Sequence, residues 1–183
     1  MTISTSTVIL VLIGLIVAWA IFTYNRFIKL VNRVKEAWSG IDVQLKRRFN
    51  LIPNLIQTVK GYAKHETELL EELTQTRAGS QDVNQRGVEE GHISRAIANL
   101  FAVAEAYPDL KASRNFLELQ GSLETIENEI QMSRRYYNGS VRDLNILVES
   151  FPSNLIARYF GFATAEFFEI ELASQRDVPK VEF

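Results

Sequence analysis

Near its N-terminus the chain carries the stretch VILVLIGLIVAWAIF, residues 8–22, in which every residue except Gly14 is apolar. The uncharged segment around it, from Thr2 to Tyr24, would be about 34 Å long as a helix, at about 1.5 Å per residue. The hydrocarbon core of a bilayer is about 30 Å thick. The sequence therefore predicts a transmembrane anchor over residues 1–25. Its representative lipid-facing side chains are Val8, Leu12, Leu15, Trp19, Phe22 and Tyr24.

A cleaved signal peptide is the alternative for this segment. Ala18-Trp19-Ala20 has the small-x-small form of a cleavage site. A signal peptide also needs a basic region before its apolar core, and no basic side chain precedes Val8. We therefore expect an anchor that is not cleaved.

The charges that follow the apolar run predict how the anchor is oriented. The first four charged side chains after it are basic, namely Arg26, Lys29, Arg33 and Lys35. Basic residues are enriched on the cytoplasmic side of membrane helices. We expect the N-terminus outside and the body in the cytoplasm, at the inner membrane. Trp19, Tyr24 and Phe27 are expected to form an interfacial aromatic belt.

Composition excludes several classes of protein. In 183 residues, 46% hydrophobic and 23% charged side chains indicate a folded chain rather than a disordered one. Cysteine is absent, which excludes disulfides and thiolate metal sites. Residues 26–64 hold nine basic and two acidic side chains, whereas residues 65–130 hold five and thirteen. A basic segment directly after the anchor suits an anionic membrane surface, and the acidic body argues against nucleic-acid binding.

Beyond the anchor, apolar residues recur three and four positions apart, which predicts helices. The pattern runs from Val31 to Leu73, from Ile93 to Ala104 and from Phe116 to Phe151. The first and third stretches are long enough to need each other as packing partners, in the manner of a coiled coil. We therefore predict an all-α fold, in which an N-terminal transmembrane helix precedes a long antiparallel helical bundle over residues 26–162, followed by a C-terminal aromatic segment and tail over residues 163–183.

Proline and glycine set the finer expectations. Pro53 either kinks one long helix or separates two, and the unbroken apolar phase favours the kink. Residues 77–92 are rich in glycine and polar residues, so we expect a disordered loop there. Asp109 is expected to cap the helix that follows Pro108. A short helix over residues 153–160 should end at Gly161.

The sequence contains few motifs that indicate catalysis or metal binding. His65-Glu66 begins like a zinc-protease motif, but Leu69 stands where the second histidine would be. The spacing of Glu89 and His92 occurs once, whereas di-iron bundles need two such pairs. We therefore expect no catalytic residues, no metal and no cofactor.

Two polar groups on the predicted long helices are candidates for a site. A structural role, in which they satisfy backbone carbonyls near Pro53, is favoured over a ligand or partner site, because buried polar groups are normally retained through hydrogen bonds to neighbours. The cluster comprises Arg47, Arg48, Asn54, Arg134, Arg135, Tyr137 and Asn138.

Three C-terminal rings form a second candidate, because short terminal segments with exposed aromatic residues often dock on a neighbour or a bilayer. They are Phe162, Phe167 and Phe168. Capping of the bundle end is favoured over this interaction surface, since apolar residues more often lie in a core.

Several long segments resemble, in order, the LemA family of bacterial membrane proteins. They include VKEAW at residue 34, IDVQLKRR at 41, LIPNL at 51 and TVKGYA at 58. YPDLKA at residue 107, RRYYN at 134, FPS at 151, FGF at 160 and EFF at 166 follow. The resemblance covers the chain from about Tyr24 onward. It implies one N-terminal membrane helix, an antiparallel bundle of long helices, no catalytic residues and a cell-envelope role.

These observations together predict a non-enzymatic single-pass membrane protein. Its helical body would self-associate, as a homo-oligomer, into a scaffold that organises or shapes the bacterial envelope membrane. Its partners would be the lipid bilayer, further copies of the chain and other envelope proteins, without nucleic acid. The alternative is a membrane-tethered module that senses a ligand or peptide, or acts as an adaptor.

Overall fold

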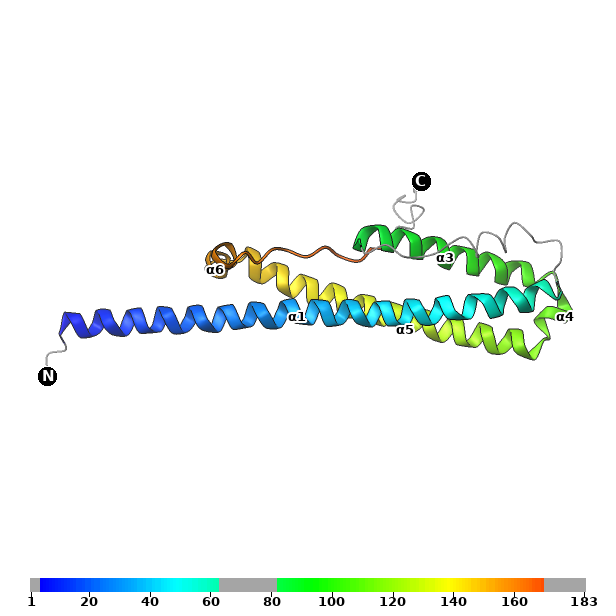
Figure 1. Ribbon diagram of the computed structural model, residues 1–183, viewed down its shortest axis with the longest axis horizontal. Coiled ribbons are helices and arrows are strands. Elements are labelled where there is room, and N and C mark those ends of the chain that lie inside the picture. Colours follow the sequence, from blue (N-terminus) through cyan, green and yellow to red (C-terminus); the bar gives the residue numbers. More distant parts are fainter. Residues whose placement is uncertain (1–3, 63–81, 170–183) are drawn as a thin grey trace, which may run out of the picture. The chain divides into compact units, whose positions relative to one another are not determined.

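The structure is a computed structural model that describes residues 4–62 and 82–169, and within these residues every regular element is a helix. The predicted all-α fold, with a long apolar helix at its start, is confirmed. The predicted apolar positions at residues 69 and 73, and the tail after residue 169, lie outside the described residues. With the labels of Figure 1, the elements are α1 (Thr5–Lys60), α3 (Val83–Ala104), α4 (Pro108–Lys111), α5 (Arg114–Glu149) and α6 (Ser153–Phe160).

Helix α1 is a single helix of 56 residues that contains Pro53. Of the two predicted alternatives, one helix rather than two is therefore confirmed. The apolar stripe continues past the proline: Ile52 before it and Leu55 and Val59 after it are all buried. Burial of this stripe offsets the roughly 3 kcal/mol that a proline inside a helix costs.

The described helices belong to two compact units, each of which is considered by itself. Unit 1 combines Met1–Ser39 with Tyr136–Ala165, and unit 2 combines Gly40–Arg135 with Glu166–Phe183. The domain boundaries predicted at residues 25 and 162 stay a prediction.

In unit 1, the start of α1 beyond the apolar run packs on the end of α5. One cluster contains Phe27 and Leu30 of α1 with Leu144 and Leu147 of α5. Further along α1, the Trp38 ring lies 5.5 Å from the Tyr137 ring of α5. Residue numbers rise along one helix while they fall along the other, so the two helices are antiparallel within this unit.

Helix α6 closes the core of unit 1 and ends where the sequence predicted. Ala157 is buried in the same cluster as Phe27. Gly161 has a φ of 74°, a left-handed conformation that favours glycine, and the Phe162 N–H donates to the Ala157 carbonyl at 2.9 Å. The helix therefore stops after Phe160 with its last turn capped.

Unit 2 has a core drawn from α1, α3, α4 and α5. Leu110 of the short helix α4 is fully buried in it, as is Leu55 of α1. Phe168, which lies after α6 in the sequence, is also fully buried within this unit. The remaining members of the cluster are Ile52, Val59, Ile93, Ala96, Ile97, Leu100, Ala104, Phe116 and Leu123.

The predicted disordered loop over residues 77–92 is wrong for residues 83–92, which form the first turns of α3. Residues 77–81 lie outside the described residues. The helix begins with Asp82, whose carboxylate accepts from the Gln85 N–H at 2.8 Å. A Cβ on Gly87 would overlap the backbone carbonyl of Glu169. Gly87 therefore serves a close approach of two chain segments rather than a loop.

The predicted cap at Asp109 is wrong as well. Helix α4 begins at Pro108 with Tyr107 as its cap, and Asp109 lies in the first turn. Proline is well suited to the first helical position, because its missing N–H would have no partner there in any case. Asp109 still places a negative charge at the positive end of the helix dipole.

Candidate functional site

Arg48 is a charged side chain inside unit 2, with 2% of its surface exposed. Its guanidinium donates to Ser94 Oγ of α3 at 2.8 Å and to Glu127 Oε2 of α5 at 3.0 Å. It also donates to Glu90 Oε2 of α3. A planar guanidinium has its donors in a fixed fork. One side chain of α1 therefore connects α1, α3 and α5.

The charges continue from Arg48 toward the surface of unit 2. Arg86 lies 3.2 Å from Glu90 Oε1 and also 3.2 Å from Asp42 Oδ1. Lys46 in turn lies 2.6 Å from Asp42. Positive and negative groups alternate along this path, so each buried charge faces an opposite one. We call these residues with Ser94 and Glu127 the Arg48 network.

Glu90 is the most buried acid of the Arg48 network. Burial raises the pKa of its carboxyl above the ordinary value, and the nearby Arg48 and Arg86 guanidiniums pull that pKa down without cancelling the effect. Breaking such a buried pair leaves an uncompensated charge, which is strongly destabilising. The geometry thus assigns the network to holding three helices together.

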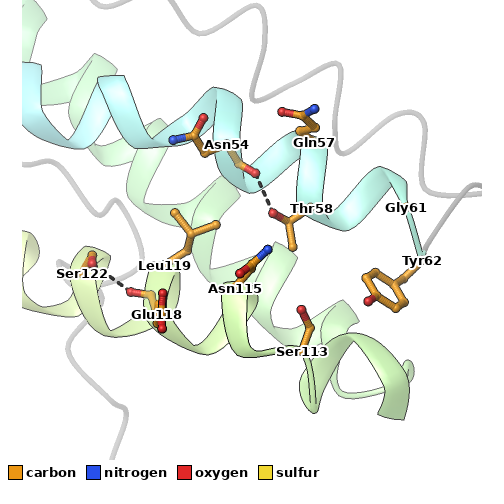
Figure 2. Close-up of a pocket in the computed structure, with 10 residues that line it drawn as sticks. All are labelled: Asn54, Gln57, Thr58, Gly61, Tyr62, Ser113, Asn115, Glu118, Leu119 and Ser122. Carbon is orange, nitrogen blue, oxygen red and sulfur yellow. Dashed lines mark hydrogen bonds between the residues drawn. The ribbon is translucent and has the colours of Figure 1, made fainter.

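A polar hollow of about 680 Å³ lies in unit 2 between the end of α1 and the start of α5 (Figure 2). Asn115 and Leu119 point from α5 toward α1 in Figure 2. Thr58 Oγ1 donates to the Asn54 carbonyl at 2.9 Å, and Ser122 Oγ donates to the Glu118 carbonyl at 2.8 Å. The lining residues are Asn54, Gln57, Thr58, Gly61, Tyr62, Ser113, Asn115, Glu118, Leu119 and Ser122.

The groups in this hollow suit hydrogen bonding rather than catalysis. Amides, hydroxyls and one phenol ring could hold a small polar molecule. The carboxylate of Glu118 is paired with Arg114 at 2.8 Å. In the described ranges, no group of three or more His, Cys, Asp or Glu residues is placed to hold a metal ion.

An aromatic junction joins α1 to the segment after α5 in unit 1. The Tyr24 ring lies 4.8 Å from the Phe160 ring and 5.6 Å from the Phe162 ring. Phe27 stacks on Phe162 at 4.6 Å. Two further hydrogen bonds fix the chain that follows, because the Asn145 side chain donates to the Ala165 carbonyl at 2.9 Å and accepts from its N–H at 2.8 Å.

The apolar run ahead of this junction is not buried by the part of the chain that the structure describes. Within α1, an 18-residue window has a mean hydropathy of 2.5, and none of that window is buried. By length and composition it can cross a membrane. Val8, Leu12, Leu15, Trp19 and Phe22 are exposed and Tyr24 is half-buried. Phe27 is fully buried, so it is a core residue rather than part of the predicted aromatic belt.

The residues of the predicted polar cluster are divided between the two units. Unit 2 holds Arg48 in its interior, and it also holds Arg47, Asn54, Arg134 and Arg135. Arg47 is exposed and bonds Gln44 of its own helix at 3.4 Å. Tyr137 and Asn138 belong to unit 1, where Tyr137 is buried.

The three C-terminal rings differ in exposure. Phe162 is half-buried in the aromatic junction, and Phe168 is fully buried in unit 2. Phe167 is exposed. Whether any of them serves as an interaction surface stays a prediction.

Sequence reasoning missed the acidic half of the Arg48 network. Glu90 lay in the segment predicted as a loop, although Arg86 and Glu90 have the spacing of an ion pair on a helix. Glu127 stands four residues after Leu123 and three before Ile130, both buried. A charged residue at a position where the helical pattern expects an apolar one was the signal that could have identified Glu127.

Comparisons with known proteins identify the family of this chain. Residues 37–183 match the LemA family. Magnetosome proteins MamQ 1 and MamQ 2 of Paramagnetospirillum magneticum are each 24% identical over an alignment of 182 positions, which covers 84% of this chain and 67% of theirs. Protein LemA of Metamycoplasma hominis is 25% identical over 158 residues, with 84% and 72% covered. The family match extends over most of the chain, and this protein is therefore a member of the LemA family.

Proposed function

We propose that this protein is a non-enzymatic, single-pass membrane protein whose helical body self-associates into a scaffold that organises or shapes the bacterial envelope membrane. The observation that carries the proposal is the apolar run of α1, which is unburied yet continues without interruption into the packed body. Water would be a poor solvent for so many adjacent apolar side chains. A bilayer would bury them and hold every copy of the body at the same surface.

Confinement supports self-association. Molecules held on one membrane meet at a high effective concentration, so weak contacts between bodies suffice for assembly. Exposed apolar side chains on the body offer such contacts, among them Val43 and Phe49 in unit 2 and Ile146 in unit 1. The names of the MamQ relatives place those proteins at magnetosomes, and by analogy we assign this chain a role at a membrane.

Size analysis in mild detergent tests the scaffold. Light scattering coupled to size-exclusion chromatography, over a wide range of protein concentration, should show a mass that rises with concentration. A strictly monomeric species across the range would remove self-association and leave the anchor in place. Hydrolytic activity that survives purification and chelation would contradict the non-enzymatic assignment.

The orientation belongs to the same proposal. The basic side chains that follow the apolar run favour a cytoplasmic body at the inner membrane. A reporter that is active on one side of the membrane only, fused after Phe183, should be active in the cytoplasm. Activity of a periplasmic reporter at that position would reverse the orientation.

A second candidate function is sensing of a ligand or peptide by the membrane-tethered body. The polar hollow between α1 and α5 favours it, because its amides and hydroxyls could bind a small polar molecule. A thermal-shift screen of sugars, amino acids and short peptides is the test. A compound that stabilises the wild-type protein but not Asn115→Trp, whose larger side chain would fill the hollow, would favour sensing.

A further inference from the structure

The exposed face of the C-terminal helix in unit 1 is strongly apolar. Leu155 and Tyr159 are four residues apart in α6 and share one side of this helix, and Phe151 lies just before the helix, ahead of Pro152. The side chains of Phe151, Leu155 and Tyr159 are 79%, 55% and 83% exposed. Phe160 beside them is 51% exposed. Side chains of this size are normally buried, so a stripe of them indicates a binding surface.

The opposite side of α6 shows which way the stripe faces. Ala157 lies two residues from both Leu155 and Tyr159, on the far side of the helix. It is buried in the core of unit 1 with Leu30 and Leu147. The stripe is therefore turned away from the packed body.

The position along α1 at which α6 packs indicates what the stripe contacts. Phe160 contacts Tyr24, which stands two residues after Phe22, the end of the apolar run. Two residues of helix correspond to about 3 Å, and the first charge, at Arg26, comes about 6 Å after Phe22. The headgroup layer of a bilayer is about 5–7 Å thick on each side. If the run crosses a membrane, Phe160 lies in that layer.

The direction of α6 fits the same surface. In Figure 1, α6 is seen almost end-on while α1 runs along the page, so the two helices of unit 1 cross. Beyond α6, the N-terminal part of α1 continues without a neighbour in that unit. A helix that crosses a transmembrane helix where it leaves the membrane lies along the surface. Apolar rings on one side and a basic residue nearby, here Arg158, are typical of interfacial helices.

We propose that Phe151 and α6 form an interfacial membrane-binding element. Phe151, Leu155, Tyr159 and Phe160 insert between the headgroups and the acyl chains of the bilayer that α1 spans, and Arg158 faces the lipid phosphates. The element adds a second attachment next to the first, which fixes the tilt of unit 1 against the membrane. This inference rests on the proposed membrane anchor.

Because the chain has no cysteine, single labels can be introduced at chosen positions of the full-length protein. Tyr159→Cys and Leu155→Cys, each carrying an environment-sensitive fluorophore, report on the stripe. Ile16→Cys reports on the apolar run. Tyr136→Cys is the matched control, because Tyr136 is also an exposed tyrosine of unit 1 but neighbours Tyr137, whose ring lies against Trp38, about 24 Å of helix beyond Phe22.

The labelled proteins are reconstituted at low protein-to-lipid ratio into vesicles of phosphatidylcholine and phosphatidylglycerol that carry nitroxide lipids. We expect nitroxides near the headgroup to quench the labels at residues 155 and 159. Nitroxides deep in the acyl chains should quench the label at residue 16, and neither should quench the label at residue 136.

The other outcomes separate the two proposals. Quenching at residue 16 without quenching at residues 155 and 159 would overturn the interfacial element and keep the anchor. It would be the result if a second copy of the chain or another protein covered the stripe. Equal quenching at residues 136 and 159 would also overturn it, because the body would then lie flat on the lipid. No quenching at residue 16 would remove the anchor itself.

Discussion

Arg48 and Arg47 are adjacent in the sequence and have opposite environments. Arg48 is buried with three partners on two other helices, whereas Arg47 is exposed and bonds its own helix. Arg48→Ala should therefore lower the free energy of unfolding by about 3–5 kcal/mol, because Glu90 would be left buried without its closest partner. Arg47→Ala should change it by less than about 0.5 kcal/mol.

Denaturant unfolding in detergent, followed by circular dichroism, measures both changes. Arg48→Lys is a further check, since a lysine keeps the charge but loses the fork that reaches several acceptors. It should be destabilised relative to wild type. Equal effects at residues 47 and 48 would show that the Arg48 network contributes little to stability.

Glu90 should make the stability of the protein depend on pH. Burial raises the pKa of its carboxyl in the folded protein above the ordinary value of 4.5. Between the unfolded and the folded pKa, the folded state binds more protons than the unfolded state, so the contribution of Glu90 to the free energy of unfolding falls as the pH rises. Below the unfolded pKa this contribution is constant.

Glu90→Gln removes this titration. Unfolding free energies measured from pH 4.5 upward should fall less steeply in the variant than in the wild type. His92→Gln is the control, because His92 is an exposed titratable side chain of the same helix. An identical slope in wild type and Glu90→Gln would mean that the carboxyl keeps its ordinary pKa.

Among the elements, α3 shows most clearly which part of the fold could not be predicted from the sequence. The long helices α1 and α5 were predictable, because their apolar residues repeat over many turns. The first turns of α3 contain Gly87 and Gly91, each of which lowers helix stability by about 1 kcal/mol relative to alanine. Tertiary packing outweighs that preference here, since Gly87 admits the backbone of Glu169. A contact across more than 80 residues has no local signal.

The same contact makes the effect of alanine depend on which glycine it replaces. In unit 2, Gly121 of α5 is exposed and a Cβ there would meet nothing within 4 Å. Gly121→Ala should raise the free energy of unfolding by about 0.5–1 kcal/mol through helix propensity alone. Gly87→Ala should lower it, because the new methyl group overlaps the Glu169 carbonyl.

Thermal unfolding of the two variants, followed by circular dichroism at 222 nm, gives the signs directly. Limited proteolysis adds a local readout, since Gly87→Ala should make the chain around Glu169 more susceptible to cleavage. Stabilisation of both variants would show that the segment after α6 does not pack on α3.

At the scale of the whole molecule, the membrane anchor could be predicted from the sequence because its main signal is the length of the apolar run. An apolar run long enough to cross a bilayer is visible without any knowledge of packing, and it stays unburied in the folded chain. The Arg48 network, by contrast, could be predicted only in part, because Arg48 is visible as a charged residue within an apolar helical pattern while its acidic partners, Glu90 and Glu127, lie 42 and 79 residues away.

Resistance to alkaline extraction should therefore depend on the apolar run rather than on the body. Ile13→Lys combined with Ile16→Lys places two charges near the middle of the run, each of which opposes insertion by about 2.5–3.5 kcal/mol. We expect the wild-type protein to remain in the membrane pellet after alkaline extraction and the double variant to be released. Ile146→Lys is the control, because Ile146 is an equally exposed apolar residue of the body, and it should stay in the pellet. Release of this control together with the double variant would mean that contacts of the body, rather than the run, hold the protein at the membrane.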